Sequence, residues 1–218
     1  MIRKVMFLST ASLMSFGVFA QSKKYVVSAT TFGISAGVNW NNINGKSADG
    51  NKLDNKIKIG FDGGANVEFP VSKGLYLQPG LEFRQKGSEL NNGNDLLLSY
   101  IDLPVNLIYK ASLGCGSMLL GFGPYVGLGI NGKMKDADGS ERKVAFNNTY
   151  SPSEADDIQF KKLDAGANFM IGYEFKSKLS AALKAQLGLV NINPDTNIPG
   201  DETRYRNTGF GLSLGYRL

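Results

Sequence analysis

Residues 96–110, LLLSYIDLPVNLIYK, constrain the fold more than any other stretch of the sequence. From Ile101 onward every second side chain is apolar, and the residues between them include a carboxylate, a proline and an amide. A period of two residues is that of a β-strand. A soluble strand usually has about 5–6 residues, whereas a tilted strand that crosses a membrane needs about 9–11. The stretch is therefore long enough to span a bilayer.

Other stretches of the chain alternate in the same way. Counted together they make about eight strands, and single-chain outer-membrane barrels have an even number of strands. We therefore expect an all-β protein, an eight-stranded antiparallel up-and-down transmembrane β-barrel. Besides 96–110, the expected strands are 32–40, 57–71, 75–86, 118–131, 163–176, 179–189 and 209–218.

Alternation alone does not say which face of each strand points into the barrel. A soluble, lipocalin-like barrel would turn its apolar face inward. The interior of an eight-stranded barrel is just wide enough to be filled by side chains. The apolar faces here are crowded with Leu, Phe, Ile and Tyr, while the opposite faces are rich in Gly with scattered charge. We expect the bulky apolar face to meet lipid and the Gly-and-charge face to line the lumen.

Charges of both signs fall on the expected lumen face. Charges inside a narrow barrel must be paired or hydrated, because unpaired burial is costly. One interpretation, which we favour at this strand number, is an ion-pair network that plugs the lumen. The other is a charged constriction in a small pore. The predicted network comprises Asp62, Glu68, Glu82, Arg84, Lys86, Asp102, Asp164, Glu174, Lys184 and Arg217, with Lys58 and Lys110 on the same face.

The first twenty residues are expected to be a signal peptide. Arg3 and Lys4 form a basic start, an apolar run follows, and small residues precede a cleavage point between Ala20 and Gln21. The alternative is an N-terminal anchor helix. The expected organisation is a signal peptide over 1–20 and a barrel domain over 21–218.

The connections alternate between long and short. Outer-membrane barrels have short periplasmic turns and longer external loops, so we expect both termini in the periplasm. We expect protein or ligand contact through loop 132–159. Its fragment Asp136–Gly139 has only part of the spacing of a calcium-binding loop, so we expect this fragment to be solvated and not to bind calcium. The long loops are 44–56, 132–159 and 193–203, the loop 87–95 is of medium length, and the short ones are 72–74, 111–117 and 176–178.

Three prolines oppose this assignment. Pro79, Pro104 and Pro124 fall inside expected strands, and proline cannot donate a hydrogen bond to a ladder. A closed barrel has no edge strand that could accommodate them. We expect bulges or locally broken pairing at these positions.

Composition argues against other function classes. The chain has no His, which excludes Ser-His and Cys-His catalysis, and the spacing of its carboxylates indicates no acid–base pair. Its 24 Lys and Arg residues form no basic run, so nucleic acid is not an expected partner. We expect no enzymatic activity, no cofactor and no metal site.

Several short motifs, in this order, resemble the PorT-like outer-membrane β-barrel family of the Bacteroidota. The resemblance implies insertion by the outer-membrane assembly machinery and contact with outer-membrane lipid. It leaves three roles open: a structural or accessory protein, a small porin for small solutes, and a component of a secretion or assembly apparatus. The motifs are GISAGVN (33–39), YIDLPV (100–105), LIYK (107–110), GFGPYVG (121–127) and an insertion-like signal at Asn207, Gly209, Leu212 and Leu214, which continues to Leu218 instead of an aromatic residue.

Overall fold

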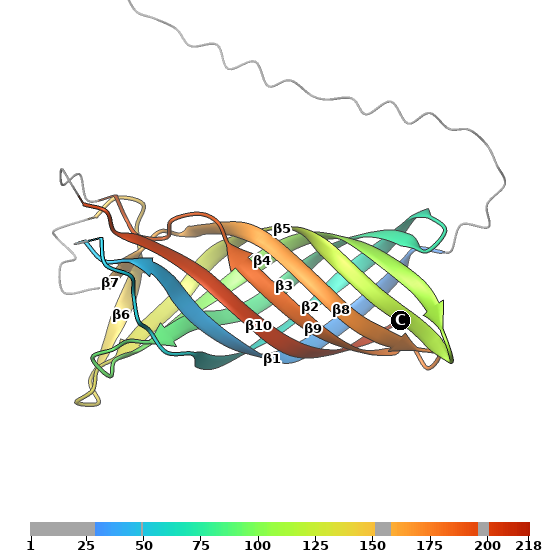
Figure 1. Ribbon diagram of the computed structural model, residues 1–218, viewed down its shortest axis with the longest axis horizontal. Helices are drawn as coiled ribbons and strands as arrows, with labels where there is room; N and C mark the ends of the chain where they lie inside the picture. Colours follow the sequence, from blue (N-terminus) through green and yellow to red (C-terminus); the bar gives the residue numbers. More distant parts are fainter. Residues whose placement is uncertain (1–28, 49, 151–157, 196–200) are drawn as a thin grey trace, which may run out of the picture.

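The computed structural model describes residues 29–48, 50–150, 158–195 and 201–218 (Figure 1). The expected signal peptide, with Ala20 and Gln21, lies outside these residues. Within the described ranges, no helix is both long and apolar enough to cross a membrane.

Eight antiparallel strands close into a barrel, which confirms the predicted fold. Each barrel strand pairs with the next one along the chain, β5 pairs with β8, and β1 pairs with β10 to close the cylinder (Figure 1). The barrel strands are β1 (Thr31–Lys46), β2 (Lys58–Ser72), β3 (Leu75–Glu89), β4 (Asp95–Leu113), β5 (Gly116–Lys135), β8 (Leu163–Phe175), β9 (Leu179–Gly188) and β10 (Arg204–Arg217).

The two ends of the barrel differ. At one end, which we call the turn end, short turns join β2 to β3, β4 to β5 and β8 to β9, and β10 finishes there (Figure 1). The opposite end, the loop end, carries the long connections. Between β5 and β8 the connection contains β6 (Glu141–Phe146), which pairs with β5, and β7 (Ile158–Phe160), which pairs with β6 in parallel.

Most strands are longer than the sequence predicted. β1 continues into the expected loop 44–56, and β5 includes residues of the expected loops on both of its sides. β10 starts at Arg204, directly after the expected loop 193–203 and before the expected strand 209–218. The expected loop 132–159 is partly strand. Antiparallel pairing continues beyond the alternating segments because backbone hydrogen bonds do not require an apolar face.

The bulky apolar side chains face outward. Ile59 is 67% exposed and Leu214 is 66% exposed, and each of the eight barrel strands carries at least one large apolar residue that is more than half exposed. The charged and Gly-rich faces line the lumen. This is the orientation that the volume of the interior predicts, and it gives the barrel an apolar outer surface suited to lipid.

A bulge in β5 corrects one assignment of faces. Ser99 of β4 pairs with Asn131, but Tyr100 pairs with Gly129, so Ile130 is an extra residue in β5. Asn131, expected on the lumen face, is therefore exposed. A bulge shifts the alternation by one residue, and here it turns Met134 into the lumen.

The prolines interrupt the ladders. Each proline lacks a pairing partner on the preceding barrel strand. Pro79 of β3 is unpaired toward β2, Pro104 of β4 is unpaired toward β3, and Pro124 of β5 is unpaired toward β4. The register is the same on both sides of each gap. The expected broken pairing is present, and it leaves room for residues that have no N–H to donate.

Candidate functional site

Charged side chains from five strands meet in the middle of the lumen. β2, β3, β4, β8 and β9 each contribute at least one, because the period of two places these residues on the inner face. Ion pairs connect them into one group, which we call the central network. Its members are Asp62, Glu82, Arg84, Lys86, Asp102, Asp164 and Lys184.

Lys86 is the centre of this network. Its Nζ lies 3.0 Å from an Asp102 carboxylate oxygen and 2.9 Å from one of Asp164, and the residue is only 2% exposed. The rings of Tyr100 and Tyr125 flank the ammonium group at 4.6 and 4.5 Å. A buried ammonium needs such partners, since its desolvation is costly. Two carboxylates and two aromatic rings thus enclose one cation.

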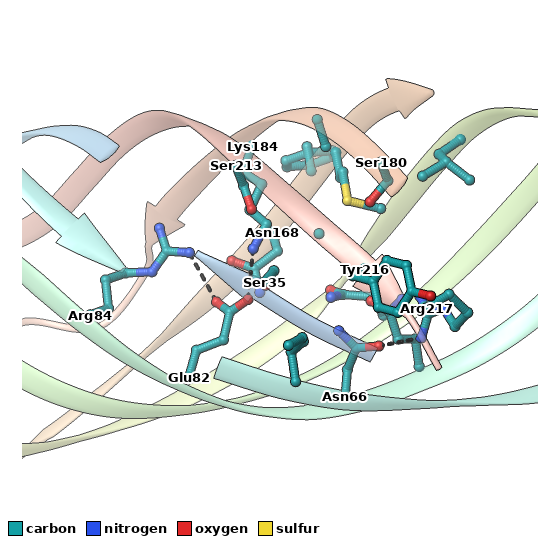
Figure 2. Close-up of a pocket in the computed structure, with 18 residues that line it drawn as sticks. Ser35, Asn66, Glu82, Arg84, Asn168, Ser180, Lys184, Ser213, Tyr216 and Arg217 are labelled. Carbon is teal, nitrogen blue, oxygen red and sulfur yellow. Dashed lines mark hydrogen bonds and ion pairs between the residues drawn. The ribbon is translucent and has the colours of Figure 1, made fainter. Parts of the chain in front are cut away.

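Glu82 occupies the next layer toward the turn end. It accepts hydrogen bonds from Arg84 at 3.0 Å and from Lys184 at 2.7 Å (Figure 2). Asp62 accepts a hydrogen bond from Asn39 at 3.1 Å and lies 3.8 Å from Lys184. With Asp102 and Asp164, the central network contains four carboxylates but only three cations.

A second group of charges lies at the turn end. Lys110 Nζ is 2.8 Å from both Glu68 and Glu174, and Arg217 donates to Glu68 at 2.6 Å. We call these four residues the mouth network. It has two charges of each sign, so its charges balance, and it lies where β2, β4, β8 and β10 reach the turn end.

A small cavity separates the two networks. Its volume is about 60 Å³, and its lining includes Asn66, Asn106, Asn168 and Gln78. Figure 2 shows Glu82 and Arg84 at one end of this space and Asn66 beside Arg217 at the other. One water needs about 10–15 Å³ measured in this way, so the cavity has room for a few waters among amide groups.

Apolar side chains fill the lumen on the loop side of Lys86. Leu96 and Leu98 lie on the same face of β4 as Tyr100 and Asp102, and β6 and β7 cover them from the loop end. This group, the apolar cluster, continues the closure that the ion pairs begin. Its buried members are Ile43, Leu96, Leu98, Tyr100, Met134, Val144, Phe160 and Ile192.

The structure brings together the charged residues that the sequence placed in the lumen. All ten of the predicted network residues belong to the central or the mouth network, and Lys110 joins the latter. Lys58 does not join either, since it pairs with Asp95 at 2.9 Å near the loop end. Within the described residues, no group of three or more His, Cys, Asp or Glu side chains could hold a metal ion.

The role of two lumen residues was not identified from the sequence. Tyr100 and Tyr125 were assigned to the inner face, but their contact with Lys86 was not foreseen. The signal that could have found them is a tyrosine on each side of Asp102 on the inner face: Tyr100 lies two residues before Asp102 on β4, and Tyr125 lies on β5 opposite Pro104, two residues after Asp102. Aromatic rings facing a lumen lysine are suited to hold its charge.

The charged hairpin between β5 and β6 forms its own ion pairs in solvent. Arg142 donates to both carboxylate oxygens of Asp136 at 2.7 Å. This hydrogen bonding holds the pKa of Asp136 below its usual value. The carboxylate that suggested part of a calcium loop is thus already paired with a cation.

Comparison with known proteins agrees with this geometry. A family model described as outer membrane protein beta-barrel domain matches residues 19–193. No curated protein matches the chain.

The similarity to solved structures is weaker than the match to the family model. The attachment invasion locus protein Ail of Yersinia pestis is 15% identical, with 88% of this chain and 100% of that chain covered and a TM-score of 0.43. Neisserial surface protein A is 10% identical, with the same coverage and a TM-score of 0.49. OprG from Pseudomonas aeruginosa is 14% identical, with 87% and 96% covered and a TM-score of 0.33.

With identities and TM-scores this low, the structural likenesses carry no argument about function. The family model matches most of the chain and agrees with the closed barrel and its apolar outer surface. The chain belongs to the outer membrane protein beta-barrel domain family, and its barrel lies in the outer membrane.

Proposed function

We propose that this protein is a closed, non-conducting barrel that serves a structural or accessory role in the outer membrane. The observation that supports this most directly is the layer around Lys86. Lys86, Asp102, Asp164, Tyr100 and Tyr125 fill the middle of the lumen, and each of them is at most 2% exposed. An ion path would have to break two short ion pairs there.

The rival function is a small porin with a charged constriction. Such a constriction needs water next to its charges along the whole path. The cavity of about 60 Å³ lies on the turn side of the Lys86 layer, and the apolar cluster lies on the other side. The arrangement of layers favours a plug.

Single-channel recording in a planar bilayer tests this proposal. The refolded barrel is expected to insert without conductance steps, with its folded state checked independently by its altered migration on unheated gels. A Glu82→Lys variant is expected to be less stable than the native protein and equally silent. Reproducible steps whose ion selectivity changes in Glu82→Lys would instead establish a pore.

An accessory role needs a surface for partners, and the hairpin of β5 and β6 supplies one. It extends past the barrel at the loop end and carries exposed charges of both signs, including Lys133, Glu141 and Arg142 (Figure 1). The resemblance to the PorT-like family supports the same role, with a component of a secretion apparatus as the partner. Assembly would use the outer-membrane insertion machinery.

We also propose that the turn end faces the periplasm and the loop end faces outward. Cys115, in the turn between β4 and β5, is exposed and is the sole Cys of the chain. A membrane-impermeant maleimide is expected to label it in cells only after the outer membrane is permeabilised. A Ser140→Cys, Cys115→Ser variant, which moves the thiol to the hairpin tip, is expected to react in intact cells. The reverse labelling pattern would invert the proposed orientation.

A further inference from the structure

A second pocket lies at the loop end, outside both charge networks. Its volume is about 400 Å³. The floor consists of buried members of the apolar cluster, each 2–5% exposed: Ile43, Leu96, Met134 and Phe160. Leu53, Leu90, Ile158 and Tyr205 complete the apolar wall. We call this the loop-end pocket.

Backbone hydrogen bonds fix the loops that form its rim. Lys56 and Glu89 exchange backbone hydrogen bonds of 2.8 and 3.1 Å, which hold the β1–β2 connection against the end of β3. Asn55 donates its side-chain amide to the carbonyl of Ile43 at 3.0 Å. Leu53 N–H donates to the carbonyl of Gly45 at 3.0 Å. Since these loops are held by regular bonds, the pocket is formed before any ligand arrives.

The mouth of the pocket is polar but has no excess of charge. Lys52 and Asp54 contribute one charge of each sign, and the rest of the polar rim is Asn55, Asn91 and Asn92. A mouth of this kind suits a group that donates and accepts hydrogen bonds without a net charge. The polar groups are gathered at the mouth, whereas the floor offers only apolar contacts and one thioether.

The size of the pocket limits its ligand. An apolar cavity of about 150 Å³ holds a benzene molecule, so this pocket accommodates a short alkyl chain or a body of two rings. Ligand sites in proteins are typically clefts of about 300–1,000 Å³ lined by apolar side chains with a few polar groups. The loop-end pocket has this size and composition.

We propose that the loop-end pocket binds a small uncharged amphiphile, with its alkyl or ring body on Leu96, Met134 and Phe160 and its polar head among the rim asparagines. This proposal adds a ligand to the proposed function. It depends on the proposed function only for the side of the membrane from which the ligand arrives. Binding itself does not depend on whether the lumen conducts.

Methyl NMR of the barrel in lipid nanodiscs can test this, with 1-octanol as the probe. The described residues contain three methionines in different environments. Met134 is in the pocket floor, Met170 lines the lumen cavity, and Met118 shares the lipid-facing side of β5 with Leu120. With ¹³C-methyl methionine, each site reports separately on the same sample.

The Met134 signal is expected to shift and saturate as 1-octanol is added, while the signals of Met118 and Met170 do not saturate. Leu53→Trp, which fills the pocket, is expected to weaken this binding at least tenfold. Leu113→Trp, the same substitution at the exposed turn end, is the matched control and is expected to leave binding unchanged.

Three other outcomes overturn the proposal. A Met134 signal that does not move means that the pocket binds no such amphiphile. If all three signals shift in proportion to the concentration of 1-octanol, the probe only partitions into lipid. Saturation at Met170 places the binding site in the lumen. This result contradicts the sealed barrel of the proposed function as well as the loop-end pocket, whereas the other two outcomes contradict the pocket alone.

Discussion

Ion pairs of nearly the same length occur in two regions of this barrel, and their surroundings make them unequal. In the lumen, Lys86 lies 2.9–3.0 Å from two carboxylates with almost no exposed surface. On the β5–β6 hairpin, Lys133 lies 2.8 Å from Glu141, but both side chains are about half exposed. Exposed pairs contribute little because water solvates each charge separately. Burial, and not distance, decides what an ion pair contributes here.

Removing Lys86 should give the largest effect. Lys86→Ala leaves Asp164 buried without its cation and leaves Asp102 with Arg84, at 3.7 Å, as its only cation. Breaking a buried pair in this way costs about 3–5 kcal/mol of unfolding free energy. Urea unfolding of the reconstituted barrel, followed by the fluorescence of its single Trp, Trp40, measures it. Lys133→Ala is the matched control and should leave the midpoint unchanged. Equal losses in both variants would remove the distinction between the two regions.

Crowding the same layer should have a smaller effect. A methyl group at Gly127 would collide with a carboxylate oxygen of Asp102, so Gly127→Ala must displace Asp102 from Lys86. Overpacking of this kind costs about 1–3 kcal/mol. At Gly63 the added methyl would make only ordinary contacts, the nearest at 3.5 Å, so Gly63→Ala is the control for the unfolding measurement. A tolerated Gly127→Ala would mean that Asp102 is not held where it lies.

Removing a carboxylate should cost far less than removing a cation. The central network contains one more carboxylate than cations, and Asp62 has its nearest cation only at 3.8 Å. Asp62→Asn keeps the shape of the side chain and removes the surplus charge, so the unfolding free energy should change by no more than about 1 kcal/mol, in either direction. A loss as large as that of Lys86→Ala would show that all four carboxylates are needed.

The smallest effect is expected on the hairpin, where only a titration should change. Arg142 lowers the pKa of Asp136, so the contribution of this pair is present at neutral pH and is lost as the pH falls through the lowered pKa. Arg142→Ala should return the Asp136 pKa toward its usual value without moving the urea midpoint at neutral pH. Carboxyl NMR of the two proteins measures the shift, and an unchanged Asp136 pKa would rule out Arg142 as its cause.

The period of two residues was enough to predict the strands of the barrel, and the volume of the interior decided which face of each strand points inward. Because a closed barrel has only two faces, alternation also placed Lys86, Asp102 and Asp164 in the lumen. It could not predict which of these charges would pair, since that depends on the stagger of strands far apart in the sequence. The bulge at Ile130 was missed because it changes the face locally without breaking the apolar pattern before it.

The loop end was the least predictable region. β6 and β7 are short, and they are strands only because β5 extends past the barrel and offers an edge for pairing. The sequence assigned this region to a solvated loop. Leu96 and Leu98 lay on a face that was expected to be polar, and the elements that cover them become visible only in three dimensions.

The pairing of β1 with β10 has a consequence for the order in which the barrel folds. Most other barrel pairings join neighbours along the chain, but this one joins Gly33 to Arg217 and Lys46 to Arg204. Bringing such distant segments together carries the largest loop-closure entropy, and contacts of this kind slow folding. Closure should therefore come last and limit the rate. Until then, both edge strands keep unpaired backbone groups that lipid cannot satisfy.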